Sequence, residues 1–134
     1  MTEFLDCAIA LLNDDLEVKS RICRIDQAPV NTIIITLDHV HANYEVFMSG
    51  RTSQFRSATI KSSYTSADID YDVGKKTIRG LIATSSLAKK GDSGAIVFDE
   101  NCYVVGIVVA RSPSTTYIIP ISRILTEFGI TIKK

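Results

Sequence analysis

Residues 91–110 read GDSGAIVFDENCYVVGIVVA, and this stretch carries the pattern on which the fold prediction depends. A polar loop ends in the letters GDSG at residues 91–94, and an apolar run over residues 95–98 follows directly. Three turn-forming residues, 99–101, then separate that run from a second apolar run over residues 103–110. Two apolar runs joined in this way predict a β-hairpin with buried strands.

Working outward, the rest of the chain predicts mostly short strands. They are expected at residues 18–25, 32–37, 44–48, 57–72, 77–83 and 115–119, with a break in 57–72 near Ser62-Ser63 or Ser66. Residues 121–128 place apolar side chains at helical intervals before Gly129, which predicts a helix and its C-cap. Residues 1–12 fit a helix or a buried strand equally well on periodicity alone. Short strands about ten residues apart indicate an all-β antiparallel barrel or sandwich.

Length and composition predict a single globular domain over residues 1–134. Apolar residues make up 46% of the chain and charged residues 22%. Basic and acidic residues number 15 each, so the net charge is zero and gives no reason to expect nucleic acid or an anionic membrane as a partner. No stretch approaches a membrane span, and residues 1–12 are a poor signal peptide.

The three cysteines each lie in an apolar run, at Cys7, Cys23 and Cys102. Buried free thiols are favoured over one disulfide with a thiol left over. Together with the poor leader, this predicts an intracellular, cytoplasmic protein, with the reservation that a fragment would have lost any signal carried upstream.

The loop at residues 91–94 has the residue types that nucleophilic catalysis requires. Gly91 allows a turn that points its N–H at a developing oxyanion, and Ser93 offers a hydroxyl together with a second N–H. Gly94 leaves room for a close substrate, and Asp92 can anchor the loop from behind. The same four residues are also ordinary formers of a hairpin tip.

The wider sequence resembles the nucleophile region of chymotrypsin-like and trypsin-like serine proteases. In that family the serine loop leads into a strand, a hairpin and a second strand with a Gly-Ile-Val motif, here within residues 105–108. Residues 120–125 (PISRIL) and 48–53 (MSGRTS) resemble further motifs of the family's intracellular and bacterial-type members. After the second motif the pattern is lost at Gln54, Arg56 and Ala58, which puts the geometry of that hairpin in doubt.

Residues 5–12 (LDCAIALL) resemble the family strand that begins with the aspartate of the catalytic triad. The resemblance therefore implies that Asp6 orients a histidine, although a simple acidic residue near a terminus is the alternative. It also implies that residues 1–26 form the Asp-bearing strand and interdomain connection, and residues 27–134 the second barrel. The expected fold is a six-stranded antiparallel Greek-key barrel with an N-terminal extra strand and a short C-terminal helix.

Neither histidine of the chain stands where the family has its catalytic base. His39 and His41 fall in a turn that enters the second barrel, so a solvated loop pair is favoured over a base. At spacing i,i+2 they would share one face of a strand, but with only Asp38 nearby the metal signal is weak. No cofactor or metal is predicted. Without a base Ser93 is a poor nucleophile, so the chain alone is expected to hydrolyse peptides negligibly.

Three accounts fit a second barrel without its histidine. The chain is a fragment of a longer protease, one part of a split enzyme, or a degenerate half-protease that acts as a protein-interaction module. A lone second barrel would expose apolar surface and favour association with an N-terminal barrel, another chain or itself. The expected substrate is a protein or peptide.

The resemblance also implies where a peptide would bind. The edge at Val109, Ala110 and Arg111 would pair with the substrate backbone, and Leu87 would lie at the base of the primary specificity pocket. Tyr117 falls near a wall position of that pocket. These side chains predict a shallow, uncharged pocket for small or apolar residues.

Overall fold

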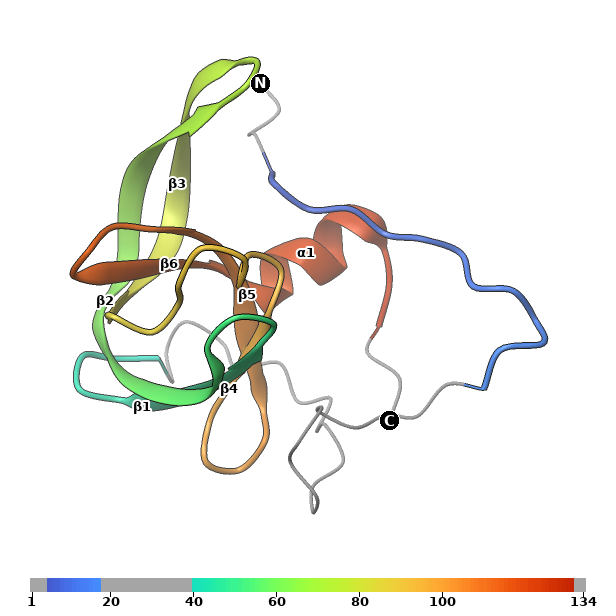
Figure 1. The fold of residues 1–134 in the computed structure, drawn as a ribbon, viewed down its shortest axis with the longest axis horizontal. Helices are drawn as coiled ribbons and strands as arrows, with labels where there is room; N and C mark the ends of the chain where they lie inside the picture. The colour runs from blue at the N-terminus through green and yellow to red at the C-terminus, as the bar shows by residue number, and fades with distance from the viewer. Residues whose placement is uncertain (1–4, 18–39, 132–134) are drawn as a thin grey trace.

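The computed structural model describes residues 5–17 and 40–131, which form a ring of strands with one short helix beside it (Figure 1). The strands are β1 (Glu45–Gly50), β2 (Gln54–Tyr71), β3 (Gly74–Ser85), β4 (Ile96–Phe98), β5 (Val104–Arg111) and β6 (Thr115–Pro120), and the helix is α1 (Ile121–Phe128). The strands predicted at residues 18–25 and 32–37 lie outside the described residues. The other predicted strands and the helix are found within a few residues of their expected bounds.

The six strands close into an antiparallel barrel in the order β1-β2-β3-β6-β5-β4. β3 pairs with β6 and β1 pairs with β4, so the chain crosses an end of the barrel between β3 and β4. This order confirms the all-β barrel.

Strand β1 shows how apolar side chains can serve both faces of the barrel wall. In β1, Val46 and Met48 point into the barrel interior, whereas Phe47 between them points outward. Phe47 stacks on Phe98 at a centroid distance of 6.0 Å in an outer cluster that also contains Leu125 of α1. One face of β1 thus fills the barrel, and Phe47 on the other face packs against the outer layer.

β2 and β3 form a long hairpin that projects beyond the ring (Figure 1). The predicted break in β2 is wrong, because the strand runs without interruption from Gln54 to Tyr71. Its pairing with β3 instead shifts register three times between Ile60 and Ala67, so the serine-rich stretch is accommodated by bulges. Bulges bend a strand, which allows the outer part of the hairpin to leave the barrel wall.

The segment 5–17 is neither a helix nor a strand, which corrects the prediction of an extra N-terminal strand for its described part. Leu5 and Cys7 pack against an outer cluster built on Ile78, Leu81 and Ile124. Further along, the segment runs away from the barrel (Figure 1) and its apolar side chains are exposed, namely Ile9, Leu11, Leu12 and Leu16. Among the described residues no strand pairs with it, so its backbone has no ladder to join.

The C-terminal helix follows directly from the last strand. Pro120 occupies the N-cap, and the buried face of α1 consists of Ile121, Ile124 and Leu125. Gly129 ends the helix in the left-handed conformation at φ 61°, as predicted. Within the described part of the chain, no helix has the length and apolar character needed to span a membrane.

Gly106 marks the tightest approach between two barrel strands and gives a test of the packing. It lies opposite Pro120, and a Cβ there would overlap the backbone oxygen of Ile119 and the side chain of Ile118. We expect Gly106→Ala to lower the free energy of unfolding by about 2 kcal/mol or more, because neither strand can move without opening the barrel. Urea denaturation measures the loss.

The matched control for Gly106→Ala is Ser57→Ala, at an exposed position of β2. This control should change the free energy of unfolding by less than about 0.5 kcal/mol. Equal stabilities of the two variants would contradict the strand register at Gly106.

Candidate active site

The loop between β3 and β4 carries the GDSG residues and is fixed at both ends to the barrel. At its start, the backbone N–H groups of Leu87 and Ala88 both donate to the buried Thr116 Oγ1, at 3.1 and 3.0 Å. At its end, the Gly94 N–H donates to the Val108 carbonyl at 2.8 Å. The loop is therefore held against β6 and β5.

Asp92 connects this loop to the turn between β1 and β2. Its carboxylate is 1% exposed, and Oδ1 accepts hydrogen bonds from the N–H groups of Thr52 at 2.8 Å and Ser53 at 3.0 Å. Oδ2 accepts from the N–H of Lys89 at 2.8 Å. The expectation that Asp92 anchors the loop from behind is met by three backbone donors.

These donors also determine the protonation state of Asp92. Burial alone raises the pKa of the carboxyl group, but hydrogen bonding to the charged form outweighs burial and lowers the pKa to about 2. The Ser53 side chain is the largest lowering cause, although its buried hydroxyl has no hydrogen bond of ordinary geometry within residues 5–17 and 40–131. The three backbone donors have good geometry, and Asp92 is ionised near neutral pH.

Two glycines let the turn and the loop meet closely. A Cβ on Gly50 would overlap the Asp92 carboxylate, and a Cβ on Gly91 would overlap the Thr52 hydroxyl. Gly91 also has φ 101°, which side chains rarely tolerate. Thr52 Oγ1 donates to the Lys90 carbonyl at 2.9 Å and completes the contact.

Ser93 is exposed at the end of this anchored loop. Within the described residues, neither its own N–H nor that of Gly91 donates a hydrogen bond. The neighbouring N–H groups of Asp92, Gly94 and Ala95 are all used, by Lys89, Val108 and Asp92 carbonyls respectively. The two N–H groups expected to form an oxyanion hole are thus the ones left available for a ligand.

Ser93 and Asp6 line the same groove, although they are far apart in the sequence. The groove has a volume of about 330 Å³ and its walls come from three segments. They are Asp6, Cys7 and Ala8 of the N-terminal segment, Ser93 and Gly94 of the loop, and Ile107, Val108 and Val109 of β5.

Asp6 has a hydrogen-bond partner that was not predicted from the sequence. The Tyr71 hydroxyl, at the end of β2, donates to Asp6 Oδ2 at 2.7 Å. Burial of Tyr71 and, next, this hydrogen bond raise the pKa of the phenol well above its usual value. The only sequence signal was the period-2 pattern that places Ile69 and Tyr71 on one face of the hairpin.

The other predicted substrate-binding residues differ in whether they line the groove. Val109 lines it, while Ala110 and Arg111 continue β5 and become progressively more exposed. Leu87 is completely buried in the barrel core and does not line the groove, and Tyr117 packs half-buried in the outer cluster with Val109. The roles of Leu87 and Tyr117 in a specificity pocket stay predictions.

Among the described histidine and cysteine side chains, only Cys7 lines the groove. His41 is exposed, its Nδ1 lies 2.9 Å from the Ala42 carbonyl, and it does not line the groove. Asp38, His39 and Cys23 lie outside the described residues. Cys7 and Cys102 are free thiols as expected, but they are half-buried rather than buried. Across residues 5–17 and 40–131, no three potential ligands gather as a metal site.

Solved structures that this chain resembles include several bacterial proteases. Cellulomonas bogoriensis chymotrypsin matches with a TM-score of 0.60 and 30% identity, over 69% of this chain and 51% of that protein. Thermobifida fusca protease A matches with a TM-score of 0.60 and 26% identity, over 70% and 51%. Nocardiopsis protease, at 22% identity and a TM-score of 0.60, supports the fold alone. No protein-family model and no curated protein matches the sequence.

The chain therefore carries one barrel of the chymotrypsin-like serine protease fold, and the resemblance seen in residues 91–110 is confirmed. It spans about half the length of the proteases that it matches.

The Asp92 anchor predicts a specific response to acid. The folded-state pKa of about 2 lies below the ordinary value of 3.8, so the folded chain binds fewer protons than the unfolded chain between these values. The contribution of Asp92 to stability, roughly 2 kcal/mol, is therefore complete above about pH 5 and lost as the pH falls toward 2. Urea denaturation at pH 6, 4, 3 and 2.5 measures this loss.

We expect Asp92→Asn to be less stable at pH 6 and to lose less stability on acidification. The matched control is Asp70→Asn, on the exposed face of β2, which should keep the acid response of the natural chain. The same acid response in Asp92→Asn as in the natural chain would show that other groups cause it.

Proposed function

We propose that the chain supplies the nucleophile, the oxyanion hole and the aspartate of a serine endopeptidase. Ser93 attacks the peptide bond, the N–H groups of Gly91 and Ser93 stabilise the oxyanion, and Asp6 orients the histidine. That histidine comes from a first barrel or from another chain. The observation that carries the proposal is the groove in which Asp6 and the exposed Ser93 lie together.

The proposed reaction transfers one proton in each of two steps. The histidine takes the proton of the Ser93 hydroxyl as Oγ bonds to the substrate carbonyl carbon, and the carbonyl oxygen becomes an oxyanion. The histidine then gives this proton to the leaving amine as the carbon–nitrogen bond breaks. Water releases the acyl group from Ser93 by the same steps in reverse.

The backbone of β5 is the proposed binding edge for the substrate. Gly94 and Ala95 already pair with Val108, so the edge of the strand that could pair with a peptide begins at Val109. An extended peptide that pairs with residues 109–111 would pass Ser93 at the mouth of the groove. The groove wall there is apolar, with Ile107, Val108 and Val109, which supports a preference for uncharged side chains.

The histidine must reach Ser93 from outside the described residues. His41 does not line the groove, and its Nδ1 is next to the Ala42 carbonyl. The exposed apolar side chains of residues 9–16 support contact with a further barrel or chain at this side of the molecule. A base on that partner would enter the groove between Asp6 and Ser93.

A second candidate function is a non-catalytic module that binds proteins. The observation that favours it is the same exposed apolar segment, which would be buried by a partner whether or not the partner brings a histidine.

Covalent labelling of Ser93 with a fluorophosphonate separates the two functions. We expect negligible labelling of the 134-residue chain alone, because no histidine lines the groove at Ser93 among the described residues. Addition of imidazole at millimolar concentration should accelerate labelling about tenfold or more, since free base then occupies the position of the histidine. The full gene product or the complex with a histidine-bearing partner should be labelled fastest. Mass spectrometry of the labelled peptide identifies the site.

Ser93→Ala is the control that must abolish labelling, and Asp6→Ala should slow labelling of the complete protease. Exposed Ser57→Ala should leave the rate unchanged. Absence of labelling in every form, with imidazole included, would contradict the protease proposal and favour the binding module.

A further inference from the structure

We propose that Tyr71 is a positioning residue, which holds Asp6 beside Ser93 through its hydroxyl from the tip of the β2–β3 hairpin. The inference rests on the proposed function, because it assigns a support to the aspartate of that site. It adds an element, the projecting hairpin, to the parts on which catalysis depends.

The carboxylate of Asp6 has few other means of being held. Its neighbours in the groove from β5 are Ile107, Val108 and Val109, whose side chains donate no hydrogen bonds. The segment that carries Asp6 is irregular and has no paired strand among the described residues. A half-buried carboxylate in such a place requires a donor, and Tyr71 supplies it at 2.7 Å.

The hydrogen bond from Tyr71 to Oδ2 leaves Oδ1 of Asp6 available to a further donor. Tyr71 binds Oδ2, and within the described residues Oδ1 of Asp6 accepts no hydrogen bond. An imidazole N–H that approaches from the groove would therefore meet Oδ1 with the carboxylate already oriented. The tyrosine restricts rotation of the side chain while the second oxygen serves the histidine.

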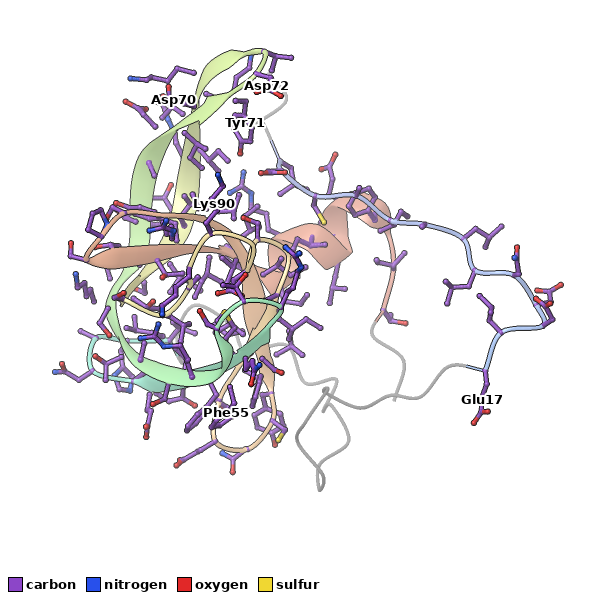
Figure 2. All side chains as sticks on the ribbon, in the orientation of Figure 1. Glu17, Phe55, Asp70, Tyr71, Asp72 and Lys90 are labelled. Carbon is purple, nitrogen blue, oxygen red and sulfur yellow. The ribbon has the colours of Figure 1, made fainter. Side chains whose placement is uncertain are left out.

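Tyr71 is itself well placed for this role. Its ring packs with Ile69 and Ala67 of the same hairpin face in the outer cluster that receives Leu5 and Cys7, the neighbours of Asp6. Figure 2 shows Tyr71 at the hairpin tip, on the side where segment 5–17 begins, with Asp70 on the opposite side. Burial and the Asp6 carboxylate raise the pKa of the phenol, so the hydroxyl stays protonated and remains a donor at physiological pH.

The length of the β2–β3 hairpin explains how Tyr71 reaches Asp6. β2 has 18 residues and continues past the end of the barrel wall, where β3 pairs with β6 only over Ile82–Ser85. The bulges between Ile60 and Ala67 redirect the outer part of the hairpin. A shorter hairpin would end before the N-terminal segment, and Asp6 would have no partner from the barrel.

The first experiment is a double-mutant cycle in the full chain with Tyr71→Phe, Asp6→Ala and both. Phenylalanine keeps the ring in its cluster and removes only the hydroxyl. We expect Tyr71→Phe to raise the unfolding equilibrium constant about tenfold when Asp6 is present and to have almost no effect in the Asp6→Ala background. Equal effects in the two backgrounds would overturn the contact and, with it, the inference.

The second experiment separates positioning from stability in the protease form that labels at Ser93. Tyr71→Phe should lower kcat about tenfold and leave KM unchanged, because Tyr71 contacts the aspartate and not the substrate. Tyr64→Phe, at an exposed position of the same strand, should change neither. If the double-mutant cycle shows coupling between Tyr71 and Asp6 but Tyr71→Phe leaves kcat unchanged, Tyr71 has only a structural role and the inference is overturned.

Failure of the proposed function is recognised separately. If Ser93 is unlabelled in every form, the protease proposal is wrong and the positioning role falls with it, while the double-mutant cycle still reports whether the contact exists.

Discussion

The candidate site depends on the hydrogen bonds that the Asp92 carboxylate accepts from backbone N–H groups. It is almost completely buried, and burial of an unpaired charge would cost several kcal/mol. Three backbone N–H groups from two different segments compensate for this cost, so the β1–β2 turn and the loop that carries Ser93 must fold together. Asp92 is buried, whereas the adjacent Ser93 is exposed. Within the described residues, the N–H groups of Gly91 and Ser93 donate no hydrogen bond and are available to a ligand.

The groove shows how a simple barrel brings distant residues together. β5 supplies an apolar wall, the loop before β4 supplies Ser93, and the N-terminal segment supplies Asp6. The first two are fixed by barrel pairing, whereas the third is held by packing of Leu5 and Cys7 and by the Tyr71 hydroxyl. Ser93 is therefore held through backbone hydrogen bonds of its loop, whereas Asp6 depends on side-chain contacts.

The sequence predicted those elements whose local pattern coincides with their tertiary role. The hairpin at residues 95–110 and the helix that ends at Gly129 were found because strand alternation, turn residues and a C-cap all agree there. The prediction of a strand at Asp6 was wrong. A strand forms only where another strand pairs with it, and the periodicity of the sequence does not identify that partner. Tyr71 was missed for a similar reason, because its contact joins two residues that are 65 positions apart in the sequence. Leu87 lies in the core, and its role at the base of a specificity pocket stays a prediction.

We propose that the loop at residues 91–94 directs a hydroxyl and two N–H groups toward one point beside Asp6. A crystal structure of the chain at better than about 1.8 Å would test this arrangement, because ordered water is then visible. One water or anion is expected within hydrogen-bonding distance of both the Gly91 and the Ser93 nitrogen atoms, with the Ser93 side chain open to the groove. A peptide group at Gly91 whose N–H bonds to the barrel, or a Ser93 side chain that is closed off from the groove, would rule this arrangement out.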